Sequence, residues 1–245
     1  APTTGQRQRM IERTAGENAP TPSSGEAARS LTSRAYRELR ADILSGRIPP
    51  GKKIRIKELQ ERFSTSLSVV REALSRLSSE DLVHAVDQRG FVASETSLED
   101  LKDLMRTRRQ IEALAIRQAV ALGTPQWEAA VSAAYARLTL LEIDGEGGGL
   151  RRAEWIAALE TFHETIVAGC ESPSLIRVCR QLSERTQRYR HLALPIAPTR
   201  EASKQHKAIL QAILARDADK AAAVLDKYFA FTQELLIAAW TAETR

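Results

Sequence analysis

The sequence has few of the features that mark exported, membrane-bound or disulfide-rich proteins. Its 245 residues include 2 cysteines, Cys170 and Cys179, which form no CxxC motif and no secreted-domain pattern. No apolar run approaches the roughly 18 residues needed to span a bilayer. The first residues also lack the apolar core of a signal peptide. We therefore expect a cytoplasmic protein with reduced cysteines and no membrane partner.

Aromatic residues are also scarce, at 5% of the chain, whereas Ala, Leu, Arg and Glu are common, a composition that favours helices. The length is sufficient for two modest domains. The net charge of +5 and the pI near 9.4 are compatible with nucleic-acid binding, but Lys and Arg are spread along the whole chain. Charge alone therefore does not decide the function.

Local composition divides the chain into three parts. Residues 1–28 are rich in Pro, Gly, Ser and Thr and have almost no bulky apolar residues, which predicts a disordered tail. In residues 29–95, three short helical patterns are followed by two Val-rich segments, "LVHAV" and "GFVAS", with "DQRG" between them. Three helices and a two-stranded wing form a winged helix-turn-helix domain. Residues 96–245 show no strand signal and about six helical patterns, which predict an antiparallel all-helical bundle. The fold class is thus mainly α.

The third short helix, "SLSVVREALSRL", has two different faces, with Ser66 as the expected N-cap. Helical spacing places Val70, Ala73, Leu74 and Leu77 on the inner face and Ser68, Arg71, Glu72 and Ser75 on the outer face. Hydroxyl groups followed by an arginine suit the reading of a polyanion. The alternative is an ordinary solvated helix surface.

These patterns resemble the GntR family of bacterial transcription regulators, in the branch with an FCD effector domain. In the first half the resemblance is carried by "ILSGRIPPGKKI", "LQERFSTSLSVVREALSRLSSEDLV" and "RGFVA", without gaps. In the second half it is carried by "RTRRQIEALA", "LETFHETIVAGCESPSL" and "KQHKAILQAILARDADKAAAVLDKYF". It covers about residues 30–240. Asp81 stands where the family usually has glycine, and Val69 where it usually has proline.

The resemblance implies that the helix beginning at Ser66 enters the major groove of double-stranded operator DNA with its first turn. The residues then expected to contact DNA are Lys57, Ser66, Leu67, Ser68, Arg71, Arg89 and Gly90. Many relatives carry arginine at the position of Leu67, so the base contact there is expected to differ, for example through a thymine methyl group. Arg89 and Gly90 are expected at the wing tip, near the minor groove.

The resemblance also implies an effector site in the helical domain, formed by Arg108, His163, His206 and Tyr228. Arg108 lies four residues before Glu112, and the matching arginine of the family pairs with a carboxylate of the effector. The alternative is a surface ion pair between Arg108 and Glu112. Further along, "RTQRYRHLAL" contributes Arg188, Arg190 and His191, which we expect to form a solvated charge cluster at a helix end. The alternative is that they fringe the mouth of the effector pocket.

Relatives bind a divalent metal such as Zn or Ni with one aspartate and three histidines. Here His163 and His206 remain, but Leu159 replaces the aspartate and Tyr228 aligns with the third histidine. Two imidazoles alone hold a divalent ion poorly. We therefore expect that no cofactor is required and that the four effector-site residues bind a small organic acid directly. The alternative is that His163 and His206 still hold a divalent ion, Zn or Ni.

Together these features predict a ligand-responsive repressor that binds a palindromic operator as a homodimer and is not an enzyme. Two alternatives remain open at this point. In one, the helical domain only dimerises and binds no effector. In the other, the chain is a metal-dependent helical-bundle enzyme, because Glu160 and His163 have the Glu-x-x-His spacing of di-iron proteins. That motif occurs once here, whereas di-iron chemistry needs it twice with two more carboxylates.

Overall fold

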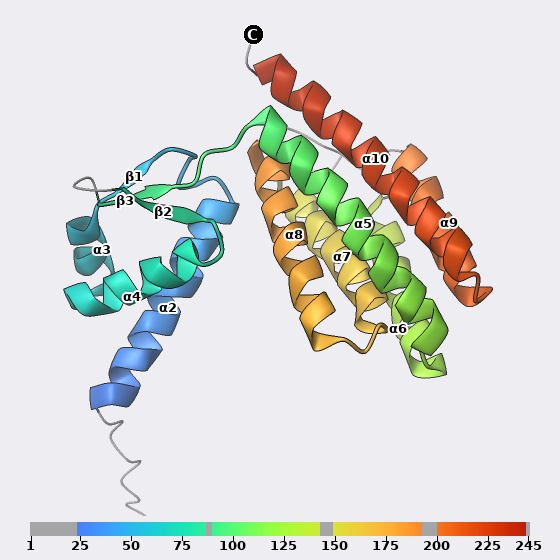
Figure 1. Cartoon of the computed structure of the whole chain (residues 1–245), viewed down its shortest axis with the longest axis horizontal. Helices are drawn as coiled ribbons and strands as arrows, with labels where there is room; N and C mark the ends of the chain where they lie inside the picture. The colour runs from blue at the N-terminus through green and yellow to red at the C-terminus, as the bar shows by residue number, and fades with distance from the viewer. Residues whose placement is uncertain (1–23, 87–89, 143–148, 193–199, 244–245) are drawn as a thin grey trace, which may run out of the picture.

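The computed structural model describes residues 24–86, 90–142, 149–192 and 200–243, and Figure 1 shows them as two units joined by one extended segment. The segment expected to be a disordered tail lies mostly outside the described residues. Its last part does not, because helix α2 (Ser24–Leu44) begins within it. No helix in the described part of the chain is long and apolar enough to cross a membrane.

The N-terminal unit contains three helices and a small sheet. Its helices are α2, α3 (Ile56–Phe63) and α4 (Leu67–Ser78). Their apolar residues meet in one core, which includes Leu39, Leu74 and Leu77, each with no exposed surface. The predicted inner face of α4 is confirmed, since Val70 and Ala73 are also fully buried. The winged helix-turn-helix prediction therefore holds.

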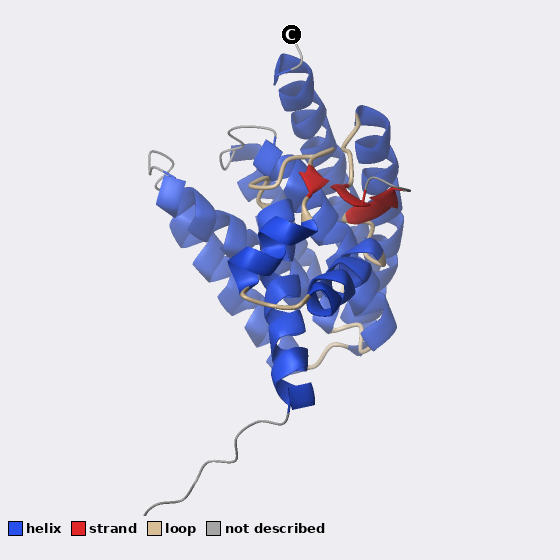
Figure 2. Ribbon diagram, turned by 90° about the vertical axis from the view of Figure 1, so that its left-hand side faces the viewer, coloured by secondary structure: helices blue, strands red, loops and turns tan. Residues whose placement is uncertain are grey.

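The sheet has three strands rather than the expected two. Strands β2 (Val83–Val86) and β3 (Gly90–Ala93) form the predicted antiparallel pair, and β1 (Lys53–Ile54) joins the other edge of β3. Figure 2 shows how small this sheet is beside the helices. A two-stranded ribbon is marginal in water, so the added strand and the burial of Ile54 stabilise the wing.

The described residues of the helical unit form six helices, in agreement with the predicted number of about six. They are α5 (Leu98–Leu122), α6 (Pro125–Glu142), α7 (Gly149–Ala168), α8 (Pro173–Leu192), α9 (Arg200–Leu214) and α10 (Ala218–Glu243). Helix α5 packs against α10, α8 and α7, so it runs through the middle of the unit (Figure 1). The described core is mostly aliphatic, with Trp127, Trp155, Phe162 and Phe229 among its larger members.

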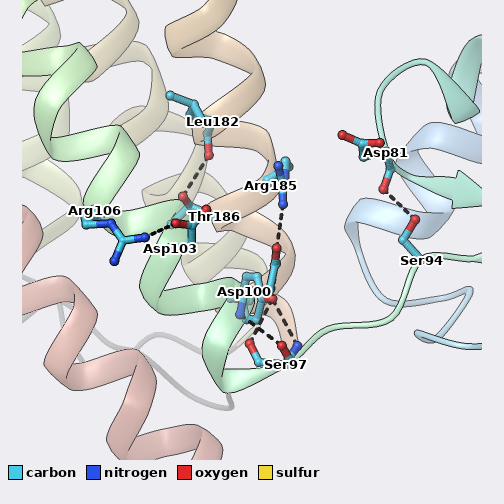
Figure 3. A network of polar contacts seen from close by, with 10 residues as sticks. Asp81, Ser94, Ser97, Asp100, Asp103, Arg106, Leu182, Arg185 and Thr186 are labelled. Atoms are coloured by element: carbon cyan, nitrogen blue, oxygen red, sulfur yellow. Dashed lines mark hydrogen bonds and ion pairs between the residues drawn. The ribbon is translucent and has the colours of Figure 1, made fainter.

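The two units are connected by the segment from Ser94 to Ser97, and this segment is anchored to α8. Ser97 caps α5, because its Oγ accepts a hydrogen bond from the Asp100 amide at 3.0 Å. Arg185 of α8 donates to Asp100 at 2.8 Å, as Figure 3 shows. Arg188 of α8 donates to the backbone carbonyl of Ser94. Helix α8 therefore holds the connection between the units.

Candidate nucleic-acid interface and ligand cavity

The outer face of α4 begins with two exposed serines. The backbone of Ser66 is extended, with φ −78° and ψ 161°, and the helix starts at the next residue, so Ser66 is the N-cap as expected. Its side chain makes no capping hydrogen bond; instead its Oγ lies 2.9 Å from the Oγ of Ser68. Both hydroxyl groups therefore face outward at the positive end of a helix, where anions bind readily.

The other expected DNA contacts that the structure describes are exposed residues of the N-terminal unit. Arg71 is exposed one turn after Leu67, and Leu67 itself keeps 45% of its surface exposed. Lys57 is exposed near the start of α3. Gly90 has a φ of +84° and nothing within 4 Å of the position of a Cβ atom. Arg89 lies outside the described residues, so its place at the wing tip stays a prediction.

The helical unit contains a cavity of about 300 Å³ between α5, α7 and α8. Its lining includes charged, hydroxyl-bearing and apolar side chains: Arg108, Glu112, Thr161, His163, Glu164, Thr165, Val167, Ala168, Ile176, Cys179, Arg180 and Ser183. This volume is at the lower end of the range for small-molecule sites. A compact organic molecule is therefore the size of ligand that it can enclose.

Arg108 contributes a buried positive charge to the wall of the cavity. Its Nε donates to Glu112 Oε1 at 2.5 Å, and its Nη2 donates to Ser183 Oγ at 3.2 Å. The guanidinium also lies over the Phe229 ring, 4.4 Å from the centroid. The side chains of Arg108 and Glu112 are 1% and 3% exposed, so the surface-pair alternative is wrong. The Nη1 group is buried and has no hydrogen-bond partner among the described residues.

His163 adds a second buried polar group to the cavity wall. Its Nε2 has no hydrogen-bond partner in the described part of the chain. Burial lowers the pKa of His163 well below its usual value, and the charges of Arg108 and Arg190 act in the same direction. The imidazole is therefore neutral near pH 7. A buried guanidinium N–H and a neutral imidazole nitrogen at one cavity are suited to a carboxylate and an adjoining hydroxyl group.

His206 and Tyr228 lie behind His163 rather than on the cavity wall. The ring centroids of His163 and Tyr228 are 5.0 Å apart, those of His206 and Tyr228 4.7 Å, and those of the two histidines 6.0 Å. The fold thus brings together the three aromatic residues that the sequence pattern singled out. Only Arg108 and His163 of the expected effector-site residues line the cavity, and direct contact of the other two with an effector stays a prediction.

The donor set around His163 does not fit a divalent metal. Leu159, one turn before His163 on α7, is 1% exposed and brings a hydrocarbon side chain where a carboxylate is needed. Among the described residues, no three His, Cys, Asp or Glu side chains are grouped so that they could hold one ion. Tyr228 accepts a hydrogen bond from Arg190 Nη2 at 3.4 Å, so a cation already faces its hydroxyl.

The expectation of a solvated charge cluster on α8 is wrong for two of its three members. Arg188 and Arg190 are 4% and 5% exposed. Arg188 is covered by the connecting segment, since it donates to the carbonyl of Ser94. For Arg190 the reason is the helical period: Cys179, Ser183, Thr186 and Arg190 follow one another at intervals of three or four residues on the inner face of α8. This spacing can be read from the sequence, but the many charged residues around it led to the prediction of an exposed cluster. Sequence reasoning therefore missed both Arg190 and the cavity residue Ser183.

Comparisons with known proteins agree with this architecture. Residues 31–92 match "Bacterial regulatory proteins, gntR family", and residues 103–231 match the FCD domain. The HTH-type transcriptional regulator BphR of Paraburkholderia xenovorans is 37% identical over 199 residues, which cover 80% of this chain and 81% of BphR. The HTH-type transcriptional repressor GlaR of Escherichia coli is 32% identical over 198 residues, covering 79% and 90%.

One solved structure gives the same result for the fold. That of McbR/YncC of Escherichia coli superposes with a TM-score of 0.71 at 25% identity, covering 86% of this chain and 98% of that protein. The likeness extends over both units, so the arrangement of a winged unit followed by a helical unit is shared.

Proposed function

We propose that this chain, which belongs to the GntR family of bacterial regulatory proteins and carries an FCD domain, is a transcriptional repressor controlled by a small organic acid. The chain has the DNA-binding unit of a transcription regulator, and GlaR, one of its relatives, is named a repressor. Operator DNA in a bacterium lies in the cytoplasm, where the protein would act. We propose no catalytic activity for this protein.

The observation that carries the DNA-binding proposal is the outer face of α4. Its first turn exposes Ser66 and Ser68, and Arg71 follows one turn later, while the opposite side of the helix is buried in the core. A recognition helix enters the major groove with its N-terminal residues. In that position the hydroxyl groups and backbone N–H groups would hold phosphate, and Arg71 would donate to guanine O6 and N7.

We further propose that the protein binds its operator as a homodimer. A two-fold symmetric dimer presents two copies of α4, so the preferred operator would be a palindrome with half-sites about one helical turn apart. Each α4 would read one half-site, and Lys57 and the wing would contact the flanking backbone. Binding should weaken steeply with salt, because phosphate contacts release counterions from DNA.

The effector proposal depends on the cavity between α5, α7 and α8. The buried Arg108 Nη1 has no hydrogen-bond partner among the described residues, and neither has the His163 Nε2 of the same cavity. Each unsatisfied buried polar group costs roughly 1–3 kcal/mol. A carboxylate ligand would accept from the guanidinium, and a neighbouring hydroxyl group would donate to the imidazole. Binding of such a ligand would therefore remove the energetic penalty of both unsatisfied groups.

The DNA-binding proposal is tested with a gel shift on the DNA upstream of the protein's own coding region. Wild-type protein should retard this DNA, and Arg71→Ala with unchanged helicity should not. Equal retardation of the upstream DNA and of unrelated DNA of the same length, at all salt concentrations, would contradict the proposal.

The effector proposal is tested by thermal denaturation with acetate, lactate, benzoate and succinate. A ligand that binds only the folded state must raise the melting temperature. At least one of these anions should do so, and the same anion should change the gel shift. If none of them alters either readout, the alternative in which the helical unit only dimerises is favoured.

A further inference from the structure

Arg190 lies in the interior of the helical unit, although it was expected at the surface. It follows Cys179, Ser183 and Thr186 along the inner face of α8 and is 5% exposed. Its Nη2 donates to the Tyr228 hydroxyl at 3.4 Å. A guanidinium is rarely buried without a compensating charge, because its transfer from water costs several kcal/mol. The position of Arg190 therefore needs an explanation.

The surroundings of Arg190 are the residues that correspond to a metal site in the family that the sequence resembles. Tyr228, which accepts its hydrogen bond, stacks on His163 and contacts His206. Burial lowers the pKa of His163, and the charges of Arg108, of His206 and, least, of Arg190 act in the same direction. Burial raises the pKa of the Glu112 carboxyl, and the charges of Arg108 and Arg190 oppose that rise. Arg190 thus contacts the aromatic cluster of His163, His206 and Tyr228 through the Tyr228 hydroxyl.

We propose that the guanidinium of Arg190 is the built-in cation of this site, which takes the place of a divalent metal and allows the cavity to bind an organic anion without one. This inference rests on the proposed effector function of the cavity and assigns a role to a residue that none of the family motifs contains. Arg190 acts behind the wall, through charge and by holding Tyr228 against His163, and Arg108 makes the direct contact with the anion.

The local charges support this assignment. Two buried guanidinium groups, Arg108 and Arg190, face one fully buried carboxylate, Glu112. The next carboxylate, Glu160, is only partly buried, so solvent screens its charge and it offsets the excess only in part. The interior is therefore short of negative charge. A bound carboxylate would correct this shortage, whereas a divalent cation would add to the repulsion.

Metal binding itself provides a test that does not depend on the identity of the effector. The proteins are treated with EDTA, dialysed and titrated calorimetrically with ZnCl₂. Wild-type protein is compared with L159D/Y228H, which restores an aspartate and a third histidine, and with L159D/Y228H/R190M, which also removes the cation. A fourth protein, L159D/Y228H/R190K, retains the positive charge. Cobalt titration provides a second readout, because tetrahedral Co²⁺ absorbs visible light strongly.

If Arg190 is the resident cation, wild-type protein has no tight Zn²⁺ site, and the triple variant with methionine binds one ion per chain. That variant should bind Zn²⁺ at least about tenfold more tightly than L159D/Y228H, because a positive charge close to the site opposes the ion. The lysine variant should resemble L159D/Y228H. Equal affinity in all three redesigned proteins would overturn the role of Arg190, and a tight site in wild-type protein would overturn the whole inference.

A measurement on the wild-type protein alone keeps the inference testable if the variants fold poorly. The melting temperature is measured with acetate, lactate, benzoate and succinate, in EDTA and after addition of ZnCl₂. An anion shift that is equally large in EDTA supports metal-free binding, and a shift that appears only with Zn²⁺ overturns it. Loss of the gel shift with upstream DNA would count against the proposed regulatory function instead, so the two failures are distinguishable.

Discussion

Arg40 of α2 forms ion pairs with Glu80 of its own unit and with Glu184 of α8, and it thereby joins the DNA-binding unit to the helical unit. All three side chains are about one-fifth exposed. The residue before Glu184, Ser183, accepts a hydrogen bond from Arg108 at the cavity. One helix therefore contacts the cavity on one side and the DNA-binding unit on the other. A ligand that shifts α8 must also change this contact.

Glu184→Ala should weaken the coupling between the two units. Because Arg40 keeps its bond to Glu80 and the pair with Glu184 is partly exposed, the loss of stability should be about 1 kcal/mol or less. The change in operator affinity caused by a saturating anion should fall from about 5- to 150-fold, the usual range of such coupling, toward no change. Fluorescence anisotropy of labelled operator DNA with and without the anion measures both affinities.

The control for this variant is Glu234→Ala, which removes the same type of side chain from an exposed position on α10. It should retain the full response to the anion. If Glu184→Ala retains it as well, the ion pair between Arg40 and Glu184 takes no part in the signal.

Arg71→Ala should lower the affinity for the specific operator by about 1–3 kcal/mol, because one bidentate contact to guanine is lost. Affinity for unrelated DNA should change far less. Arg137→Ala removes an equally exposed arginine from α6, and this control should bind the operator like wild-type protein. Titrations of operator and unrelated DNA at fixed ionic strength separate the two effects. A uniform loss for both DNAs would show that Arg71 contacts only phosphate.

The fold was largely predictable because its signals are local. In α4 the positions of Val70, Ala73, Leu74 and Leu77 predicted the buried face, and all four have no exposed surface. The Ser-x-x-Asp pattern of residues 97–100 is typical of a helix N-cap, and in the structure the Ser97 Oγ accepts from the Asp100 amide. Such features depend on residues within one or two turns, so a single sequence is sufficient to show them.

The features that were missed depend on packing between distant segments. Strand β1 has only two residues, and nothing within them predicts the pairing of Ile54 with Phe91. Arg188 and Arg190 lie in a charge-rich stretch that is typical of an exposed helix. Their burial depends on which segments pack against α8. Arg188 donates to the carbonyl of Ser94, 94 positions away, and Arg190 faces Tyr228 on α10. Tertiary contacts of this kind override the average preference of charged residues for water.

The buried pair of Arg108 and Glu112 allows a test of stability that is separate from ligand binding. Arg108→Met leaves the Glu112 carboxyl buried without a partner, which should cost about 3–5 kcal/mol. R108M/E112M removes both charges and fills the space with apolar side chains of similar length. Its stability should return to within about 1 kcal/mol of wild type or exceed it. Urea denaturation followed by circular dichroism gives the three free energies of unfolding.

The same double variant should fail to respond to any carboxylate, because the guanidinium that would donate hydrogen bonds to the anion is gone. Arg109→Met is a matched control, since Arg109 is the next arginine on α5 and pairs with Asp226 at the partly exposed outer side of the helix. It should keep the anion-induced rise in melting temperature. A persistent shift in R108M/E112M would place the anion site elsewhere.

Asp81 has a left-handed backbone, with a φ of +56°, at the position where the resembled family usually has glycine. A side chain in this region costs energy that glycine avoids. The contact that fixes the turn is to the main chain: Ser94 Oγ donates to the Asp81 carbonyl at 2.5 Å (Figure 3), and this bond survives replacement of the side chain. Asp81→Gly should therefore raise the free energy of unfolding by about 0.5–1 kcal/mol.

Ser79, in the same turn, provides a control with the opposite expected effect on stability. Ser79 is also exposed, but its φ of −70° is ordinary for any residue, and its Oγ donates to the Arg76 carbonyl at 2.7 Å. Ser79→Gly gains no relief of strain, loses that hydrogen bond and makes the unfolded chain more flexible, so it should lower stability by about 1 kcal/mol. Urea denaturation of the two variants should thus give changes of opposite sign. A loss of stability in both would show that the Asp81 side chain makes a favourable contact that outweighs its backbone strain.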